Sequence, residues 1–340
     1  MANVSRRNFL RTTAALAALP GVASVPTLAH AAAKFRFKCG HDLPITHPAH
    51  LRLQAAAARI SQKTGGQFEL QVFGDGQLGR AADMFTQVRS GGLEMALTPD
   101  VVVATLTPAA SINAVGFAFA DEQDAFAAMD GDLGAFVRKQ INQSGLQVMD
   151  KIWENGFRQI TSSVKPINTP ADLHGFKIRV PVSPLVVSMF EKLGAGPTAL
   201  NLGEVYSSLQ TKVVDGEENP LTTIYTAKFY EVQKYCSMTN HQWNGDWMLV
   251  NTDSWNALPP AMRQIVANEI NQSALDLRSD VDKLNTSLVK TLTDHGMVFN
   301  RTDPKPFRDA LKQAGFYADW RNRFGPAGWA VLTHYAKDLA

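Results

Sequence analysis

Arg179 is the residue of this sequence whose type and setting point most directly to chemistry. It lies in the strand-like run 176–180, between Ile178 and Val180 and just before Pro181. A guanidinium group keeps its charge when it is desolvated, and its planar fork matches a carboxylate. Because an arginine among apolar neighbours needs an anion, this setting favours an anion receptor. The alternative is a structural salt bridge to an acidic residue of the chain.

Three histidines, His41, His47 and His50, lie close together in the sequence and next to Asp42, a combination that can hold a metal ion. His47 and His50 flank Pro48 at the expected start of a helix, which is an irregular spacing for ligands on one helix face. We therefore expect a solvent-exposed or ligand-adjacent loop, with His41 as a candidate ligand contact. A metal ion is the less favoured alternative, and we predict no cofactor.

Aromatic residues could form the apolar part of a binding pocket. The candidates are Trp243, Trp247, Trp153, Phe117 and Phe119. Trp243 and Trp247 stand in a segment rich in Asn and Gly without a clear helical pattern, although ordinary core packing remains the alternative. We predict Trp243, Trp247 and Phe117 as ligand contacts. If these rings face a cleft, the ligand is a compact monocarboxylate with an apolar or aromatic body.

Two short motifs match those of penicillin-binding hydrolases. They are Ser162-x-x-Lys165 and Lys63-Thr64-Gly65. In those enzymes Lys-Thr-Gly follows the nucleophile, whereas here it precedes Ser162, and the sequence contains no Ser-Asp-Asn and no Gly-x-Ser-x-Gly. We therefore predict that the protein is not an enzyme, with an exported serine hydrolase as the disfavoured alternative.

Residues 1–31 have the features of an export signal. Paired Arg6 and Arg7 precede a mildly apolar, Ala-rich stretch, and Ala29-His30-Ala31 offers a cleavage site. We predict a twin-arginine signal peptide over 1–31 and a mature protein in the periplasm. Removing these residues changes the net charge from +2 to about −1, because they hold three basic residues and no acidic one. Without a basic excess, nucleic acid is not an expected partner.

Two internal features are interpreted as core structure. The uncharged run 101–120 is long enough to span a membrane, but Pro108 and Asn113 interrupt it, so we expect broken core structure. Cys39 and Cys236 lie in strand-like runs far apart in the sequence. They could pair in an oxidising compartment, but two buried free thiols are the more common outcome.

The order of strands and helices predicts an α/β protein with a parallel sheet covered on both faces. Alternating apolar residues predict the first strand at 35–39, and Thr46 is expected to cap the helix that follows. The other expected strands are 67–73, 93–97, 148–153, 157–161, 176–180 and 198–202, with helices at 81–90, 184–193 and 203–214. Apolar residues then recur every three or four positions over about 261–295, which predicts a helix about 50 Å long that spans both of two domains.

The central third of the chain carries ordered motifs of one family. They are Trp153-x-Asn155-Gly156-Phe157-Arg158, Asp172-Leu173-x-Gly175-x-Lys177-Ile178-Arg179-Val180-Pro181, Glu204-Val205-Tyr206-x-x-Leu209-Gln210, Val214-Asp215-Gly216-x-Glu218-Asn219-Pro220 and Thr239-x-His241. In these motifs the sequence resembles the solute-binding receptors of tripartite ATP-independent periplasmic (TRAP) transporters, of the C4-dicarboxylate-binding receptor type. The similarity extends more weakly over nearly the whole mature chain.

The resemblance implies a two-domain periplasmic-binding-protein clam-shell, type II-like, with a long domain-spanning helix. We expect domain I to comprise residues 32–155 and about 244–280, and domain II to comprise 156–243 and about 281–340. It also implies a monomeric receptor that captures an organic acid and delivers it to the TRAP membrane permease subunits. A receptor of the same fold that feeds a sensor kinase fits the sequence equally.

Residue by residue, the resemblance implies that Arg179 clamps a ligand carboxylate and that Arg158 is a second basic contact. It implies that Asn219 hydrogen-bonds the same carboxylate, although from the residues alone Asn219 before Pro220 would be a turn residue. The chain departs from the family at Leu202, where many members carry Phe, and this leaves the shape of the pocket open.

Overall fold

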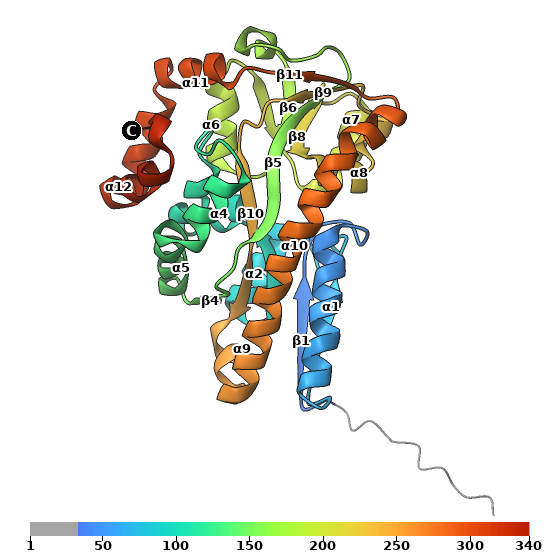
Figure 1. Ribbon diagram of the computed structural model, residues 1–340, viewed down its shortest axis with the longest axis vertical. Coiled ribbons are helices and arrows are strands. Elements are labelled where there is room, and N and C mark those ends of the chain that lie inside the picture. Colours follow the sequence, from blue (N-terminus) through green and yellow to red (C-terminus); the bar gives the residue numbers. More distant parts are fainter. Residues whose placement is uncertain (1–32, 340) are drawn as a thin grey trace, which may run out of the picture. The chain divides into compact units, whose positions relative to one another are not determined.

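The computed structural model describes residues 33–339 (Figure 1), so the predicted signal peptide lies outside the described residues. The uncharged run 101–120 begins within helix α3 (Asp100–Val103) and continues into the 3-10 helix η1 (Pro108–Ala114), which confirms the expected broken structure. None of the helices that the structure describes combines the length and the apolar character needed to cross a membrane.

A single mixed sheet of eleven strands forms the centre of the described chain. Its main path runs through β2 (Phe68–Phe73), β1 (Phe35–Gly40), β3 (Met95–Pro99), β10 (Trp243–Asn251), β5 (Trp153–Ser162), β8 (Gly216–Pro220), β6 (Lys177–Val180) and β7 (Gly196–Ala199). Strand β4 (Leu146–Val148) pairs with β10, β9 (Tyr235–Met238) with β5, and β11 (Val298–Arg301) with β9. We call the parallel group β1–β3 the first half and the parallel group β6–β8 the second half.

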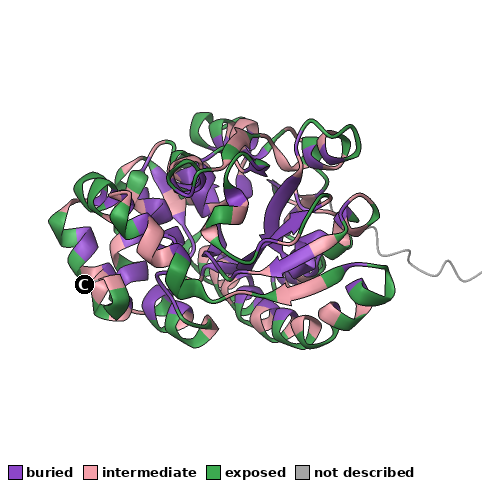
Figure 2. Ribbon diagram, turned by 90° about the horizontal axis from the view of Figure 1, so that it is seen from above, coloured by how far each residue is buried: buried purple, intermediate pink, exposed green. Residues whose placement is uncertain are grey.

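Strands β5 and β10 join the two halves. Trp153–Phe157 of β5 pairs with β10, and Arg158–Ser162 pairs with β8, both antiparallel. Every residue of both strands is buried. Figure 2 shows buried residues gathered in the interior and exposed residues mainly on the outer helices and loops. The strand predicted at 157–161 lies within β5, which begins earlier, at Trp153, and continues through Gly156, whose φ of 110° accompanies an irregularity in the pairing with β10. The strand predicted at 148–153 is wrong, because β4 ends at Val148 and β5 begins at Trp153.

Helices cover the sheet, and the α/β prediction is confirmed, but the predicted parallel sheet is wrong because β5 and β10 run antiparallel to their neighbours. They are α1 (Pro48–Lys63), α2 (Ala81–Ser90), α4 (Glu122–Asp130), α5 (Asp132–Gln143), α6 (Pro184–Lys192), α7 (Leu202–Gln210), α8 (Leu221–Thr226), α9 (Thr252–Asn256), α10 (Pro260–Asp294), α11 (Pro304–Gln313) and α12 (Phe316–Tyr335). Helix α12 packs on α4, α5, α6 and α11, whereas α10 packs on α1, α8 and β5. Figure 1 shows these two helix groups on either side of β5 and β10.

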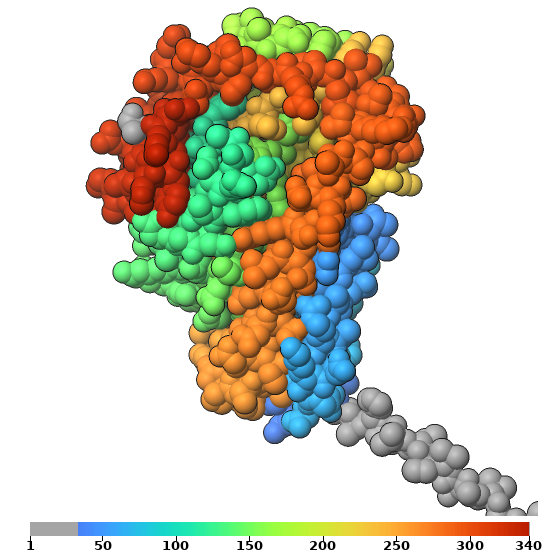
Figure 3. Space-filling view, in the orientation of Figure 1, coloured from blue at the N-terminus to red at the C-terminus, as the bar shows by residue number. Residues whose placement is uncertain are grey.

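Helix α10 is the predicted long helix, with 35 residues. Along α1 it contributes to one apolar cluster through residues from Met262 to Val281, and further on Leu288 and Leu292 enter a second cluster around Phe229. Its outer face lies at the surface beside α1 (Figure 3). The helix therefore connects the packing of both halves, as predicted, while the division into two domains stays a prediction.

Several local boundaries differ from the sequence prediction for identifiable reasons. Helix α1 is capped by His47 instead of Thr46, because Pro48 occupies the first helical position. The strand expected at 198–202 ends at Ala199, since Asn201 and Glu204 form a capping box that starts α7 at Leu202. Cys39 and Cys236 are both buried and free, as expected.

Candidate functional site

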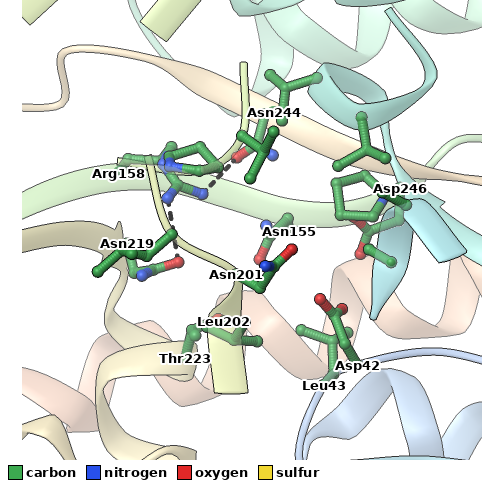
Figure 4. A pocket seen from close by; sticks show the side chains of 18 of the residues that line it. Asp42, Leu43, Asn155, Arg158, Asn201, Leu202, Asn219, Thr223, Asn244 and Asp246 are labelled. Carbon is green, nitrogen blue, oxygen red and sulfur yellow. Dashed lines mark hydrogen bonds between the residues drawn. The ribbon is translucent and has the colours of Figure 1, made fainter. Parts of the chain in front are cut away.

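A cleft lies where the carboxyl ends of strands from both halves meet (Figure 4). It encloses about 660 Å³, including the part open to solvent. Asp42 follows β1, Val101 follows β3, Pro181 follows β6 and Asn201 follows β7, and all four line the cleft. Ligands of open α/β sheets bind beyond the carboxyl ends of the strands, so the fold itself makes this cleft the candidate site.

Arg158 lies on β5 and is fully engaged with protein groups. Its Nε and Nη2 form a forked pair with the carboxylate of Glu218, with Nη2 to Oε1 at 2.9 Å. Nη2 also donates to Oδ1 of Asn219 at 3.1 Å, and Nη1 donates to Oδ1 of Asn244 at 3.3 Å (Figure 4). The neighbouring strand β8 therefore supplies a permanent counter-ion for this arginine.

Glu218 is ionised because of this pair. Burial is the largest single influence and opposes the charge, but it is outweighed by the combined charge and hydrogen bonds of Arg158 and His241, whose Nε2 lies 3.1 Å from Oε2. Together they lower the pKa of Glu218 to about 2. His241 is in turn held through Nδ1 by the hydroxyl of Thr239 at 2.7 Å. Arg158, Glu218, His241 and Thr239 thus form one buried network on the second-half side of the cleft.

Arg179 has a different environment, although it also lines the cleft. Its Nε and Nη2 both donate to the backbone carbonyl of Leu200, at 3.0 and 2.7 Å. Across residues 33–339, no carboxylate lies within 4.0 Å of its guanidinium group. Burial lowers the pKa of Arg179 to about 10, and the positive charge of Arg158 contributes in the same direction. Arg179 is therefore a buried cation that the described part of the chain leaves without an ion pair.

Asn219 completes this side of the cleft. Its Nδ2 donates to Oε2 of Glu217 at 2.5 Å while its Oδ1 accepts from Arg158. Glu217 also accepts from the hydroxyl of Thr161 at 2.8 Å, and burial raises the pKa of Glu217 to about 7. The orientation of the Asn219 amide is thus fixed by two charged or titratable neighbours, and Asn219 lies on a strand instead of in a turn.

The structure brings Arg179, Arg158 and Asn219 together in the cleft, but it places the other four predicted contacts elsewhere. Trp243 packs edge-on against Phe119 and Phe126, and Trp247 is completely buried. Phe117 packs near Phe307 and lines a separate groove. His41 lies in the loop that follows β1 and packs against His50. Alternation along β10 explains the tryptophans, because Asn244 and Asp246 take the positions that reach the cleft.

The three histidines are buried, so the predicted solvent-exposed loop is wrong, although the adjacent Asp42 lines the cleft. Nε2 of His41 lies 2.9 Å from Nδ1 of His50. Burial lowers the pKa of His41 and of His47 to about 3, so these rings are neutral. Among the described residues, no group of three or more His, Cys, Asp or Glu has an arrangement that could hold a metal ion.

The hydrolase-like motifs have structural roles. The Ser162 hydroxyl accepts from the backbone N–H groups of Val164 and Lys165, each at 3.1 Å, where β5 ends in a turn. Lys165 lies 4.0 Å from Asp172, and Lys63 pairs with Glu269 on α10. Among the described residues, neither lysine ammonium group is hydrogen-bonded to the Ser162 hydroxyl.

Most of the cleft lining was not predicted as ligand contacts, including the polar residues Asp42, Asn155, Asn244 and Asp246. Asn155 stood in a quoted family motif, and Asp246 stood between the two tryptophans. Strand alternation could have revealed Asn244 and Asp246. In a strand, the residues next to Trp243 and Trp247 project to the face opposite the two rings.

The sequence matches the family described as "Bacterial extracellular solute-binding protein, family 7" over residues 39–318. A 2,3-diketo-L-gulonate-binding periplasmic protein of Escherichia coli (strain K12) is 31% identical over 294 residues, covering 86% of this chain and 89% of that protein. The sugar acid binding protein of Advenella mimigardefordensis in complex with galactonate is similar in structure, with a TM-score of 0.85 and 26% identity over 91% of this chain and 100% of that one. A TRAP periplasmic solute-binding protein of Roseobacter denitrificans with bound β-D-glucuronate has a TM-score of 0.84 and 29% identity. The match covers 88% of this chain and 99% of that one.

Proposed function

This chain belongs to family 7 of the bacterial extracellular solute-binding proteins, and on that premise we propose that it holds the carboxylate of an organic acid on Arg179. We propose that it captures this acid in the periplasm and delivers it to the membrane permease subunits of a TRAP transporter. It acts as a receptor, and the acid leaves it chemically unchanged.

The observation that carries this proposal is the uncompensated charge of Arg179. The Leu200 carbonyl accepts from Nε and Nη2, and Nη1 has no hydrogen-bond partner among residues 33–339. A buried guanidinium group without a counter-ion is costly, and a bound carboxylate would supply both the opposite charge and the missing acceptors. Asn219, fixed beside Arg158, is the polar residue that we propose hydrogen-bonds the same carboxylate.

The charges of the cleft support a ligand with one carboxylate. Arg158 is neutralised by Glu218, so we propose that it contacts the ligand only at the edge of the carboxylate site. A second carboxylate would find no second unpaired arginine among the described lining residues. The apolar or aromatic body expected from Trp243 and Trp247 loses its basis, because those rings lie outside the cleft, and a compact monocarboxylate remains the proposal.

Isothermal titration calorimetry with galactonate, glucuronate, 2,3-diketogulonate and succinate tests the proposal. We expect one of the monocarboxylates to bind, Arg179→Ala to abolish measurable binding, and Arg179→Lys to weaken it, because an ammonium group lacks the planar fork. Arg278→Ala is the matched control, since Arg278 is partly buried and ion-paired with Asp130 outside the cleft. Unchanged affinity in Arg179→Ala would refute the carboxylate site, and NMR detection of a converted acid would refute a receptor without catalysis.

We further propose that residues 32–155 with about 244–280, and residues 156–243 with about 281–340, move as two domains that close on the ligand. The support is that Arg179 belongs to the second half and Asp42 to the first, so one ligand can contact both. Small-angle X-ray scattering should show a smaller radius of gyration with ligand. An unchanged radius at saturation would contradict closure, and the measured mass would test the proposed monomer.

The twin-arginine route is proposed for residues 1–31. Replacing Arg6 and Arg7 with lysine should leave the full-length precursor in the cytoplasm, because that route requires the arginine pair. Cell fractionation checks this, and normal export of the double variant would exclude the route.

A further inference from the structure

We infer that Asn155 and Asp246 select hydroxyl groups on the ligand, so that the cargo is a hydroxylated monocarboxylate. This inference rests on the proposed function, because it assumes that the carboxylate lies on Arg179. Asn155 is on β5 and Asp246 on β10, and both line the cleft (Figure 4). Nothing in the chemistry of Arg179 requires these two residues, so they call for a separate explanation.

Both side chains carry a buried oxygen to which no residue of the described chain donates a hydrogen bond. Asn155 is 6% exposed and Asp246 is 2% exposed. Oδ1 of each has no hydrogen-bond partner among the described residues, whereas the nearby Asn244 is engaged through Oδ1 with Arg158 and through Nδ2 with Asp100 at 3.4 Å. Buried polar atoms in folded proteins are normally paired. Two unpaired oxygens at one cleft therefore indicate partners that the ligand brings.

The chemistry of these oxygens specifies the partner. The free oxygen of Asn155 is an acceptor and requires a donor such as a hydroxyl group. Burial raises the pKa of Asp246 well above its ordinary value; Asp100 and Asp42 add to this, while Arg158 opposes it. A carboxylic acid that keeps its proton both donates and accepts, and a hydroxyl group does the same. An apolar ligand body would leave both oxygens unpaired.

The test compares acids that differ only in their hydroxyl groups. Galactonate is paired with hexanoate, and erythronate with butanoate, so that each pair shares a carbon chain and a carboxylate. Calorimetry on the wild-type protein should show the hydroxylated member binding at least about tenfold more tightly in at least one pair, since a site built for hydroxyl groups rejects the analogue without them. If neither hydroxylated acid binds more tightly than its counterpart, the inference is overturned.

Two isosteric variants assign the effect to residues. Asp246→Leu and Asn155→Leu should each weaken binding of the hydroxylated acid about tenfold and leave the unhydroxylated acid within about threefold, because each removes one hydrogen bond to the ligand. Asp246→Asn should restore most of the affinity, since an amide also donates and accepts. Equal weakening for both acids of a pair would show that the residues only shape the cleft, which would also overturn the inference.

Glu154→Gln is the matched control, because Glu154 is buried on the same strand but does not line the cleft. Burial raises the pKa of Glu154 to about 8, so this variant changes a comparable buried acid outside the site. Its affinity for both acids should equal that of the wild-type protein. The Arg179→Ala variant distinguishes failure of this inference from failure of the proposed function. If only this inference fails, the variant still binds neither acid of a pair. If the proposed function fails, the variant binds both acids as the wild-type protein does.

Discussion

Arg158 and Arg179 lie on neighbouring parts of one sheet, line the same cleft and are equally buried, at 3% exposure each. Arg158 has a carboxylate, Glu218, fixed against it by β8, whereas within residues 33–339 Arg179 bonds only to the backbone carbonyl of Leu200. Burial alone therefore does not distinguish a structural arginine from a ligand-binding one. The difference lies in whether the protein itself supplies the counter-ion.

The largest effect that would sharpen this comparison is the loss of the Arg158 counter-ion. We expect Glu218→Ala to reduce the free energy of unfolding by about 3–5 kcal/mol, because it leaves a buried guanidinium unpaired. Urea denaturation at neutral pH measures this. The paired variant Arg158→Met with Glu218→Leu should recover most of the loss, since it removes both charges and keeps the volume. If Glu218→Ala is as stable as the wild-type protein, the two arginines do not differ as described.

Arg179→Met should show the opposite pattern. We expect binding of the carboxylate ligand to weaken by about 2–5 kcal/mol, while the free energy of unfolding without ligand stays within about 1 kcal/mol or increases. The reason is that Arg179 has no ion pair among the described residues for the substitution to break. Calorimetry and urea denaturation of the same preparation measure both quantities. A loss of stability as large as that of Glu218→Ala would make Arg179 a structural arginine.

Two adjacent glutamates of β8 should give opposite pH dependences. The pKa of Glu218 falls from 4.5 to about 2, so its contribution to stability is present above pH 4.5 and is lost as the pH falls toward 2. Burial raises the pKa of Glu217 from 4.5 to about 7, so the folded protein holds an extra proton between these values and stability falls as the pH rises through them.

Urea denaturation from pH 4.5 to 7.5 isolates the Glu217 contribution. Compared with Glu217→Gln, the wild-type protein should lose an additional amount on the order of 1–3 kcal/mol over this range. Thr161 and Asn219 both donate to Glu217, and the ionised form gains from each, which limits the size of the effect. If the free energies of unfolding of the two proteins change in parallel with pH, the pKa of Glu217 is not raised and its contrast with Glu218 is refuted.

The sequence allowed Arg179 to be predicted but not its contrast with Arg158. The apolar residues around Arg179 are local in the sequence and signal burial directly. The partner of Arg158 lies 60 residues away, and only the register of β5 on β8 brings the two together. Strand β8 itself reads Gly-Glu-Glu-Asn-Pro, without an aliphatic or aromatic residue, so no hydrophobic pattern marks it as a buried strand.

Across the fold, elements with a local hydrophobic pattern were predicted, and elements without such a pattern were missed. Helix α10 was predicted almost to its ends because its apolar residues repeat over 35 positions. Strand β10 was not among the predicted strands, because its first residues alternate Trp with Asn and Asp in a segment that resembles a loop. The far wall of the cleft was therefore missed together with the strand that carries it.

The smallest predicted effect concerns Trp243, which the sequence placed in the pocket with Arg179. Its ring packs edge-on against Phe119 and Phe126, with centroids 6.3 and 5.9 Å away, and it does not line the cleft. We expect Trp243→Phe to change ligand affinity by less than about twofold and the free energy of unfolding by about 1 kcal/mol, because the buried Nε1–H has no partner among the described residues to lose. Calorimetry with galactonate and thermal denaturation measure the two effects. A tenfold loss of affinity would show that Trp243 contacts the ligand and would support a ligand with an apolar or aromatic body. Recognition of the cargo would then depend on an apolar surface as well as on Arg179.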